Sequence, residues 1–143
     1  MKRSAALAPL SRDHHHALVI ASALARADDA TARSSAMLFA DFIREHEARH
    51  FALEESLLLP ALPDAERARQ LAERVLADHR YLQDAARQLR LGHPQPSVEV
   101  LRSIGARLRT HVQLEERELF PYLEKSLDPT SLEQLGARLE AAR

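Results

Sequence analysis

One string of residues occurs twice in the chain, as HFALEESLLLP at residues 50–60 and as HVQLEERELFP at residues 111–121. Both copies keep His, Leu, Glu, Glu, Leu and Pro at matching positions. In an α-helix, side chains four residues apart are separated by about 40° around the axis, so the His and the first Glu of each copy share a face. An imidazole and a carboxylate one turn apart can bind a transition metal together. Two such helices facing each other would supply enough ligands for two metal ions.

The second glutamate of each copy is Glu55 or Glu116. It lies about 140° from the histidine around an ideal helix. We therefore expect this side chain to point elsewhere and to contribute little to a metal site.

An Asp-His pair precedes each copy, Asp13-His14 in the first half of the chain and Asp78-His79 in the second. This order predicts two similar helical hairpins, each with one His on its first helix and a His-Glu pair on its second. Surface histidines would not be expected to recur in the same order in two halves. The candidate metal ligands are His14, His50, Glu54, His79, His111 and Glu115.

Two neighbouring histidines, His15 and His16, compete with His14 for the role of ligand. His14 falls in a stripe of residues spaced three and four apart, which predicts a helix face toward the core. The stripe consists of Leu7, Leu10, His14, Ala17, Ala21 and Leu24. It favours His14 and leaves His15 as an alternative ligand.

The composition limits the chemistry of such a site. The chain has 143 residues, enough for one domain with a hydrophobic core, and no cysteine. Disulfides, iron-sulfur clusters, zinc-thiolate sites and thiol nucleophiles are excluded, so nitrogen and oxygen must hold any metal. With 20 basic and 21 acidic residues, the chain gives no electrostatic sign of binding to nucleic acid or to an anionic membrane.

Hydropathy gives no sign of a membrane segment. No part of the chain approaches the ~20 apolar residues that cross a bilayer, and the longest apolar run covers residues 17–25. Lys2 and Arg3 are followed by Pro9 and by a charged pair, unlike a secretory signal. We expect a cytoplasmic protein.

Few glycines and many Ala, Leu, Arg and Glu residues predict an all-α fold. We expect an up-down-up-down four-helix bundle with a short C-terminal helix, in a single domain over residues 1–143. The bundle core is expected at about residues 7–127 and the last helix at about 130–142. Capping and turn residues give the four long helices as about 7–26, 37–58, 64–92 and 97–127.

Several local signals mark the helix ends. The expected N-caps are Ser11, Asp64, Ser97 and Thr130. Residues 92–96 form the clearest loop, and Pro121 is expected to kink or end the fourth helix.

Four stretches of the chain resemble the hemerythrin-like, or HHE cation-binding, family. They are LSRDHHHAL at residues 10–18, RHFALEESLLLP at 49–60, ADHRYL at 77–82 and THVQLEERELFP at 110–121. The resemblance covers about residues 10–127. It implies a four-helix bundle with a non-haem di-iron centre, whose His and Glu ligands project inward.

Carried over residue by residue, the resemblance assigns the ligands to His14, His50, Glu54, His79, His111 and Glu115. It implies two iron ions, Fe2+ or Fe3+, bridged by Glu54, by Glu115 and by an oxo or hydroxo group. Family members bind or respond to small ligands such as dioxygen, nitric oxide or peroxide, which makes a binding or sensing protein the first expectation. The alternatives are iron storage or handling, and an oxidase or peroxidase-like enzyme.

The chain departs from oxygen-carrying hemerythrin in two places. Those proteins have a second His on the third helix, whereas here Val75 and Gln83 flank His79, and they have Asp at the position of Glu115. The histidine count is one short, which argues against reversible oxygen carriage. His46, one turn before His50, is the alternative residue for the missing position.

A different motif overlaps the first repeat. The segment HEARH at residues 46–50 matches the HExxH pattern of zinc peptidases, in which Glu47 would be the general base. That hypothesis leaves the second repeat unexplained, and it requires a third ligand and a substrate cleft. In the di-iron hypothesis Glu47 is expected to point away from the ligands. A helical interaction module without metal is the remaining alternative.

Overall fold

The computed structural model describes residues 2–92 and 95–143, and all of the regular secondary structure in these residues is helical. This confirms the all-α prediction. The α-helices are α1 (Ala8–Ala25), α2 (Ala32–Phe42), α3 (Ala48–Leu53), α4 (Glu66–Leu91), α5 (Val98–Leu114), α6 (Phe120–Ser126) and α7 (Pro129–Ala142). The π-helical segments η1 (Ile43–Glu47), η2 (Glu54–Leu58) and η4 (Glu115–Leu119) and the 3-10 turn η3 (Leu59–Ala61) lie between them.

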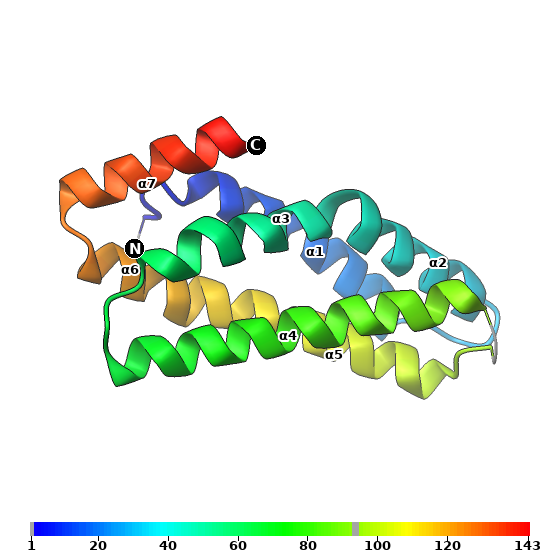
Figure 1. Cartoon of the computed structure of the whole chain (residues 1–143). Helices are drawn as coiled ribbons and strands as arrows, with labels where there is room; N and C mark the ends of the chain where they lie inside the picture. Colours follow the sequence, from blue (N-terminus) through cyan, green and yellow to red (C-terminus); the bar gives the residue numbers. More distant parts are fainter. Residues whose placement is uncertain (1, 93–94) are drawn as a thin grey trace.

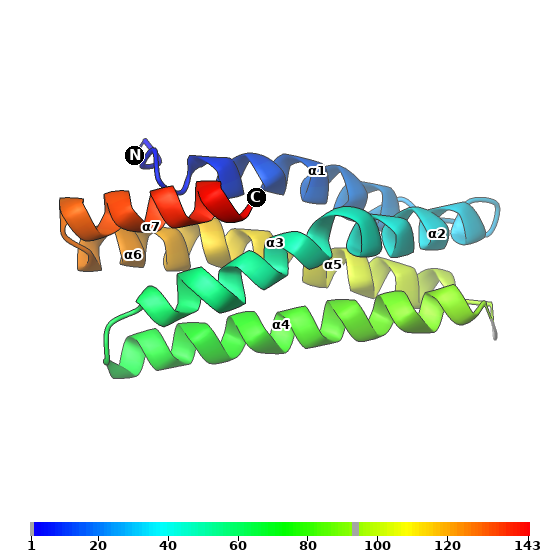
Figure 2. The same ribbon diagram turned by 45° about the horizontal axis from the view of Figure 1, so that its top comes forward.

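The long helices run side by side as a bundle (Figure 1). The segment formed by α2, η1 and α3 follows one course, and α5, η4 and α6 follow another. The views in Figure 1 and Figure 2 both place α7 outside the bundle, beside the N-terminal part of α1. Among the described residues, no helix combines the length and the apolar character needed to cross a membrane.

The helix ends differ in detail from the sequence prediction. Ser97 caps α5 as expected, since its hydroxyl accepts a hydrogen bond from the Val100 amide. The αL conformation of Gly92 ends α4 as expected. However, α7 is capped by Asp128, two residues before the predicted cap, and α4 starts after Ala65 without a side-chain cap. α1 begins at Ala8, close to the expected start, but Ser11 lies inside this helix and does not cap it.

The apolar core has two parts. One contains Phe51, Leu101 and Leu108, and the other contains Leu58 and Phe120, among other residues. Each part contributes an aromatic ring to the polar centre of the bundle, because Phe51 stacks on His79 and Phe120 stacks on His14. The candidate ligands therefore lie where the two apolar parts meet.

A π turn follows the first glutamate of each repeat. In η2 the Glu54 carbonyl accepts a hydrogen bond from the Leu59 amide, and in η4 the Glu115 carbonyl accepts one from the Phe120 amide. Such turns insert one extra residue into a helix and occur frequently at functional sites. The disruption expected at Pro121 therefore takes the form of a π turn just before it, after which α6 continues.

Helices α1 and α5 pack closely because α5 has a glycine at their contact. A Cβ atom added to Gly105 would lie 2.8 Å from Cβ of Leu24 and 3.0 Å from the carbonyl oxygen of Ala21. Only glycine allows this approach, and it brings His14 of α1 and His111 of α5 into the same interior.

Candidate metal centre

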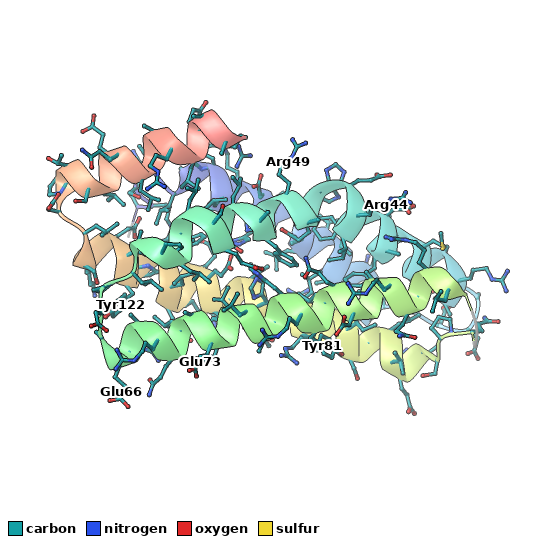
Figure 3. All side chains as sticks on the ribbon, viewed as in Figure 1. Arg44, Arg49, Glu66, Glu73, Tyr81 and Tyr122 are labelled. Atoms are coloured by element: carbon teal, nitrogen blue, oxygen red, sulfur yellow. The ribbon has the colours of Figure 1, made fainter. Side chains whose placement is uncertain are left out.

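Six side chains from different helical segments meet in the interior of the bundle. They are the six predicted from the repeat: His14, His50, Glu54, His79, His111 and Glu115. Each is at most 3 % exposed. By contrast, Arg49 and Glu73 project outward from the helices in Figure 3.

The six side chains form two groups that share both glutamates. One group consists of His14, His50, Glu54 and Glu115, and the other consists of Glu54, His79, His111 and Glu115. Within each group, one ligand atom per residue lies within 4.8 Å of the others. Each group offers two imidazole nitrogens and two carboxylate oxygens, a donor set that suits a divalent transition metal.

Each shared carboxylate directs one oxygen to each group. Oε2 of Glu54 lies 3.1 Å from Nε2 of His50, and Oε1 lies 3.0 Å from Nε2 of His79. Oε1 of Glu115 lies 2.8 Å from Nε2 of His14, and Oε2 lies 3.1 Å from Nε2 of His111. This arrangement allows both carboxylates to bridge two cations.

Two polar atoms in the interior of the cluster have no hydrogen-bond partner among the described residues and could instead bind a cation. Within the described part of the chain, Nε2 of His111 and Oε2 of Glu115 are buried and make no hydrogen bond. A buried polar atom without a partner is costly, and a cation between these two atoms would satisfy both. The buried His/Glu cluster therefore fits a metal site.

A second layer of carboxylates holds the outer nitrogen of every histidine in the cluster. Nδ1 of His14 lies 2.6 Å from Glu116, and Nδ1 of His79 lies 2.7 Å from Glu55. Nδ1 of His50 lies 3.0 Å from Asp13, and Nδ1 of His111 lies 3.0 Å from Asp78. An imidazole that donates its Nδ1 hydrogen to a carboxylate keeps Nε2 free for a metal, in a fixed ring orientation.

Glu55 and Glu116 lie outside both groups of ligands, as expected, but the sequence prediction missed that each contacts a histidine of the cluster. Each contacts a histidine on the neighbouring helix in the bundle, which the angle around its own helix does not reveal. Each also lies in a π turn, where consecutive side chains are separated by a smaller angle than in an α-helix. The sequence did contain a signal, because both copies of the repeat keep the second glutamate.

The outer contacts follow a cyclic order around the bundle. Asp13 of α1 contacts His50 of α3, and Glu55 of η2 contacts a histidine of α4. In turn, Asp78 of α4 contacts a histidine of α5, and Glu116 of η4 contacts one of α1. Each of the four long courses of the bundle thus supplies a carboxylate that contacts a histidine of the next course.

Charge pairing inside the cluster shifts the pKa of several groups. Burial alone would lower the pKa of the His14 imidazole, but its hydrogen bonds to Glu115 and Glu116 outweigh burial and raise this pKa to about 9. Burial also opposes the charged form of His111, whose pKa is raised to about 10 mainly by the charge of Glu115. The pKa of His50 is likewise held well above 6.5. In the metal-free cluster, protonated imidazoles therefore supply the positive charge that a metal would otherwise bring.

The two alternative ligands lie outside both groups. His15 and His46 are exposed, and the His46 ring packs against the His16 ring at a centroid distance of 4.9 Å. Glu47 was expected to point away from the ligands but is buried, with Oε1 3.8 Å from Nδ1 of His50. Burial raises the pKa of Glu47 to about 7. The π segment η1, which ends at Glu47, alters the direction of these side chains relative to a regular helix.

Comparisons with known proteins agree with this geometry. A family model described as the hemerythrin HHE cation-binding domain matches residues 6–123. Searches of the curated proteins and of the solved structures found no match. The family match covers most of the chain and includes all six residues of the buried cluster. The chain therefore belongs to the hemerythrin HHE cation-binding family.

Proposed function

We propose that this protein holds two non-haem iron ions in an up-down-up-down four-helix bundle and uses them to bind or respond to a small ligand. The observation that supports this most is the sharing of Glu54 and Glu115 between two groups of ligands. Metal pairs bridged by glutamates from facing helices are a known use of helical bundles. His14 and His50 would hold one ion, and His79 and His111 the other.

The donor set supports iron over the other common metals. Nitrogen and oxygen donors in equal number suit iron, while the absence of cysteine removes the thiolates that select zinc or copper(I). Zinc also accepts such donors and binds more tightly than ferrous iron as a rule. Binding of iron instead of zinc therefore depends on a supply of ferrous iron and on the two adjacent groups of ligands that share both glutamates.

The protein supplies four donor atoms to each position, which leaves coordination positions open on an ion that prefers six. Two bound iron ions would supply reversible redox chemistry together with a place for dioxygen, nitric oxide or peroxide. The chain contributes the orientation of the imidazoles through the outer carboxylates, and Phe51 and Phe120 cover rings of the cluster on its apolar sides. We propose the small ligand as the partner, with no role in nucleic-acid or membrane binding.

The zinc-peptidase hypothesis receives no support from the geometry. It needs His46 and His50 on one metal ion, but His46 lies outside both groups of ligands and against the His16 ring. Glu47 lies on the other side of His50 from the shared carboxylates, near Nδ1 instead of Nε2.

The proposal is tested by metal analysis and optical spectroscopy. The metal-free protein is reconstituted anaerobically with ferrous iron, its iron content is measured, and oxygen is then added while the spectrum is recorded. We expect about two iron ions per chain and new near-ultraviolet absorption from a bridged ferric pair. Iron content near zero in a folded protein would contradict the proposal, and an equal preference for zinc under reducing conditions would contradict the choice of metal.

A further inference from the structure

A pocket of about 210 Å³ opens between α1 and the segment formed by α2, η1 and α3. Its lining includes His16, His46, Glu47 and His50. His50 is also a member of the buried cluster, so the pocket ends at the wall of the candidate metal centre. Hence the pocket connects exposed side chains to a buried ligand.

The side chains of the pocket are arranged in two levels, one helical turn apart. At the outer level, the His16 ring of α1 faces the His46 ring of η1, with their centroids 4.9 Å apart. At the inner level, Asp13 of α1 contacts His50 of α3 at 3.0 Å. Both outer histidines are exposed, whereas His50 is buried.

Glu47 lies between these levels and is the least satisfied carboxylate of the pocket. It is 3 % exposed, and within the described residues it makes no hydrogen bond. Its nearest charged partner is Nδ1 of His50 at 3.8 Å. A buried carboxylate without a hydrogen bond that lines a pocket is suited to accept a cation entering that pocket.

The second half of the chain has a different set of residues at the matching positions. Tyr81, Arg107 and Leu108 stand where the first half has His16, His46 and Glu47. The Arg107 guanidinium lies over the Tyr81 ring at 4.5 Å and donates a hydrogen bond to Asp78 at 2.6 Å. Arg107 thus replaces His46, and the apolar Leu108 replaces Glu47. Potential metal-binding groups are therefore concentrated beside the first half of the cluster.

We propose that this pocket is a loading site for divalent metal ions, in which His16 and His46 take an ion from solvent and Glu47 receives it before it reaches the buried centre. The transfer step rests on the di-iron function proposed above, whereas binding of a divalent ion at the pocket does not.

Two basic side chains also line the pocket, and neither closes it to a cation. Arg143 makes two contacts with Asp13, at 3.1 and 3.2 Å, so its charge is compensated. Arg49 projects outward from the helix in Figure 3. Glu45 also lines the pocket and is paired with Arg44 at 3.2 Å, so Glu47 is the acidic side chain of the pocket left without an arginine partner among the described residues.

The loading rate provides the test. Metal-free wild type and the double variant His16→Ala/His46→Ala are mixed anaerobically with ferrous iron, and uptake is followed by withdrawing samples into a ferrous chelator. We expect the double variant to load about tenfold more slowly, because the two imidazoles that take the ion from solvent and raise its local concentration at the pocket are lost. Its final iron content should equal that of the wild type, since neither histidine belongs to the buried groups.

His15→Ala is the matched control, because His15 is an exposed histidine of α1 that does not line the pocket. This variant should load at the wild-type rate. Glu47→Gln should load slowly without losing final content. All the substituted histidines are exposed, so the thermal unfolding temperature should change little and serves to verify the fold.

A second measurement does not involve loading. Equilibrium dialysis of the iron-loaded wild type against Co2+ should detect an additional weakly bound ion that the double variant lacks. Equal loading rates in wild type and double variant would overturn the loading site and leave the di-iron function intact. A lowered final iron content in the double variant would also overturn it, because the histidines would then act at the centre. Failure of the folded wild type to take up iron would overturn the di-iron function and with it the transfer step, and dialysis of the metal-free protein against Co2+ would then decide whether the pocket binds a divalent ion.

Discussion

The Glu116 carboxylate lies 2.6 Å from Nδ1 of His14, although the two residues are 102 positions apart in the sequence. Glu116 also accepts a hydrogen bond from the Ser11 hydroxyl and contacts Arg3 at 3.2 Å. It thereby connects η4 to α1 beside the candidate metal centre. The Glu116 carboxylate is partly exposed whereas the His14 imidazole is buried, so Glu116 orients the ring without belonging to the buried cluster.

Replacing Glu116 with Ala should weaken metal binding without removing the site. Loss of a carboxylate that orients a ligand histidine typically costs about 10–100-fold in metal affinity. Affinity can be measured by competition with a chromophoric chelator. Glu118→Ala is the control, since Glu118 lies on the same π turn but contacts only exposed arginines among the described residues. Equal losses in the two variants would contradict the orienting role.

Replacing a shared carboxylate should affect both metal positions. Glu54→Ala removes one oxygen from each group, so we expect both ions to be lost together and the absorption of a bridged pair to disappear. Glu55→Ala, which removes only an outer contact to His79, should keep the stoichiometry and weaken affinity. Retention of one tightly bound ion in Glu54→Ala would show that this carboxylate is not shared.

The neighbouring histidines His14 and His15 should behave differently. His14→Ala removes a buried donor of one group only, so tightly bound metal should fall to roughly half. His15→Ala replaces an exposed side chain and should leave the metal content unchanged. The metal content of the two purified variants is measured. A lower metal content in His15→Ala than in His14→Ala would identify His15 as the ligand instead of His14.

The metal-free protein should lose stability as the pH rises above neutrality. The pKa of His14 is raised to about 9 and that of His111 to about 10. The contribution of the two protonated imidazoles to stability is therefore fully present below pH 6.5 and is lost as the pH rises through these pKa values. The unfolding temperature of the metal-free form should therefore fall between pH 7 and 10. The metal-loaded form requires neutral imidazoles and should show a smaller decline.

The same titration predicts proton release on metal binding. Imidazoles that are protonated in the metal-free cluster must lose their protons when a metal binds. Calorimetric titration in buffers of different ionisation enthalpy measures the number of protons released at neutral pH. An absence of buffer dependence would show that the cluster is already neutral before metal binds.

Gly105→Ala should destabilise the fold although alanine favours helices. The gain in helix propensity is about 1 kcal/mol, whereas overpacking costs about 1–3 kcal/mol. The added Cβ would lie 2.8 Å from Leu24 and 3.0 Å from the backbone of Ala21, and backbone cannot move aside easily. We expect the free energy of unfolding to fall by about 1 kcal/mol, measured by denaturant unfolding. Ser103→Ala, exposed on the same helix, should change it by less than about 0.5 kcal/mol.

The buried cluster was predictable because its signal is local. A His and a Glu four residues apart share a helix face whatever the rest of the chain does, and the repeat showed that the pattern was not accidental. The helical nature of the chain followed from composition and periodicity in the same way. Helix starts were less accurate, as at Asp128 and Ala65, because neighbouring polar residues compete for the cap.

The outer carboxylates and Glu47 were not predictable from an ideal helix. Glu55 and Glu116 act on a neighbouring helix, so their role depends on the packing of the bundle. Glu47 is buried at the end of a π turn that no propensity scale indicates. In both cases the error came from treating each helix as regular and isolated.

The contrast between Glu47 and Leu108 gives the two halves of the centre different chemical surroundings. A symmetric dimer of identical hairpins would present the same residues beside both positions. A single chain is free of that restriction, and here an acidic, accessible side faces a side closed by Arg107 and Tyr81. Two ions held by the same kinds of ligand would therefore differ in exchange rate and in redox potential, so that one could be replaced or oxidised before the other.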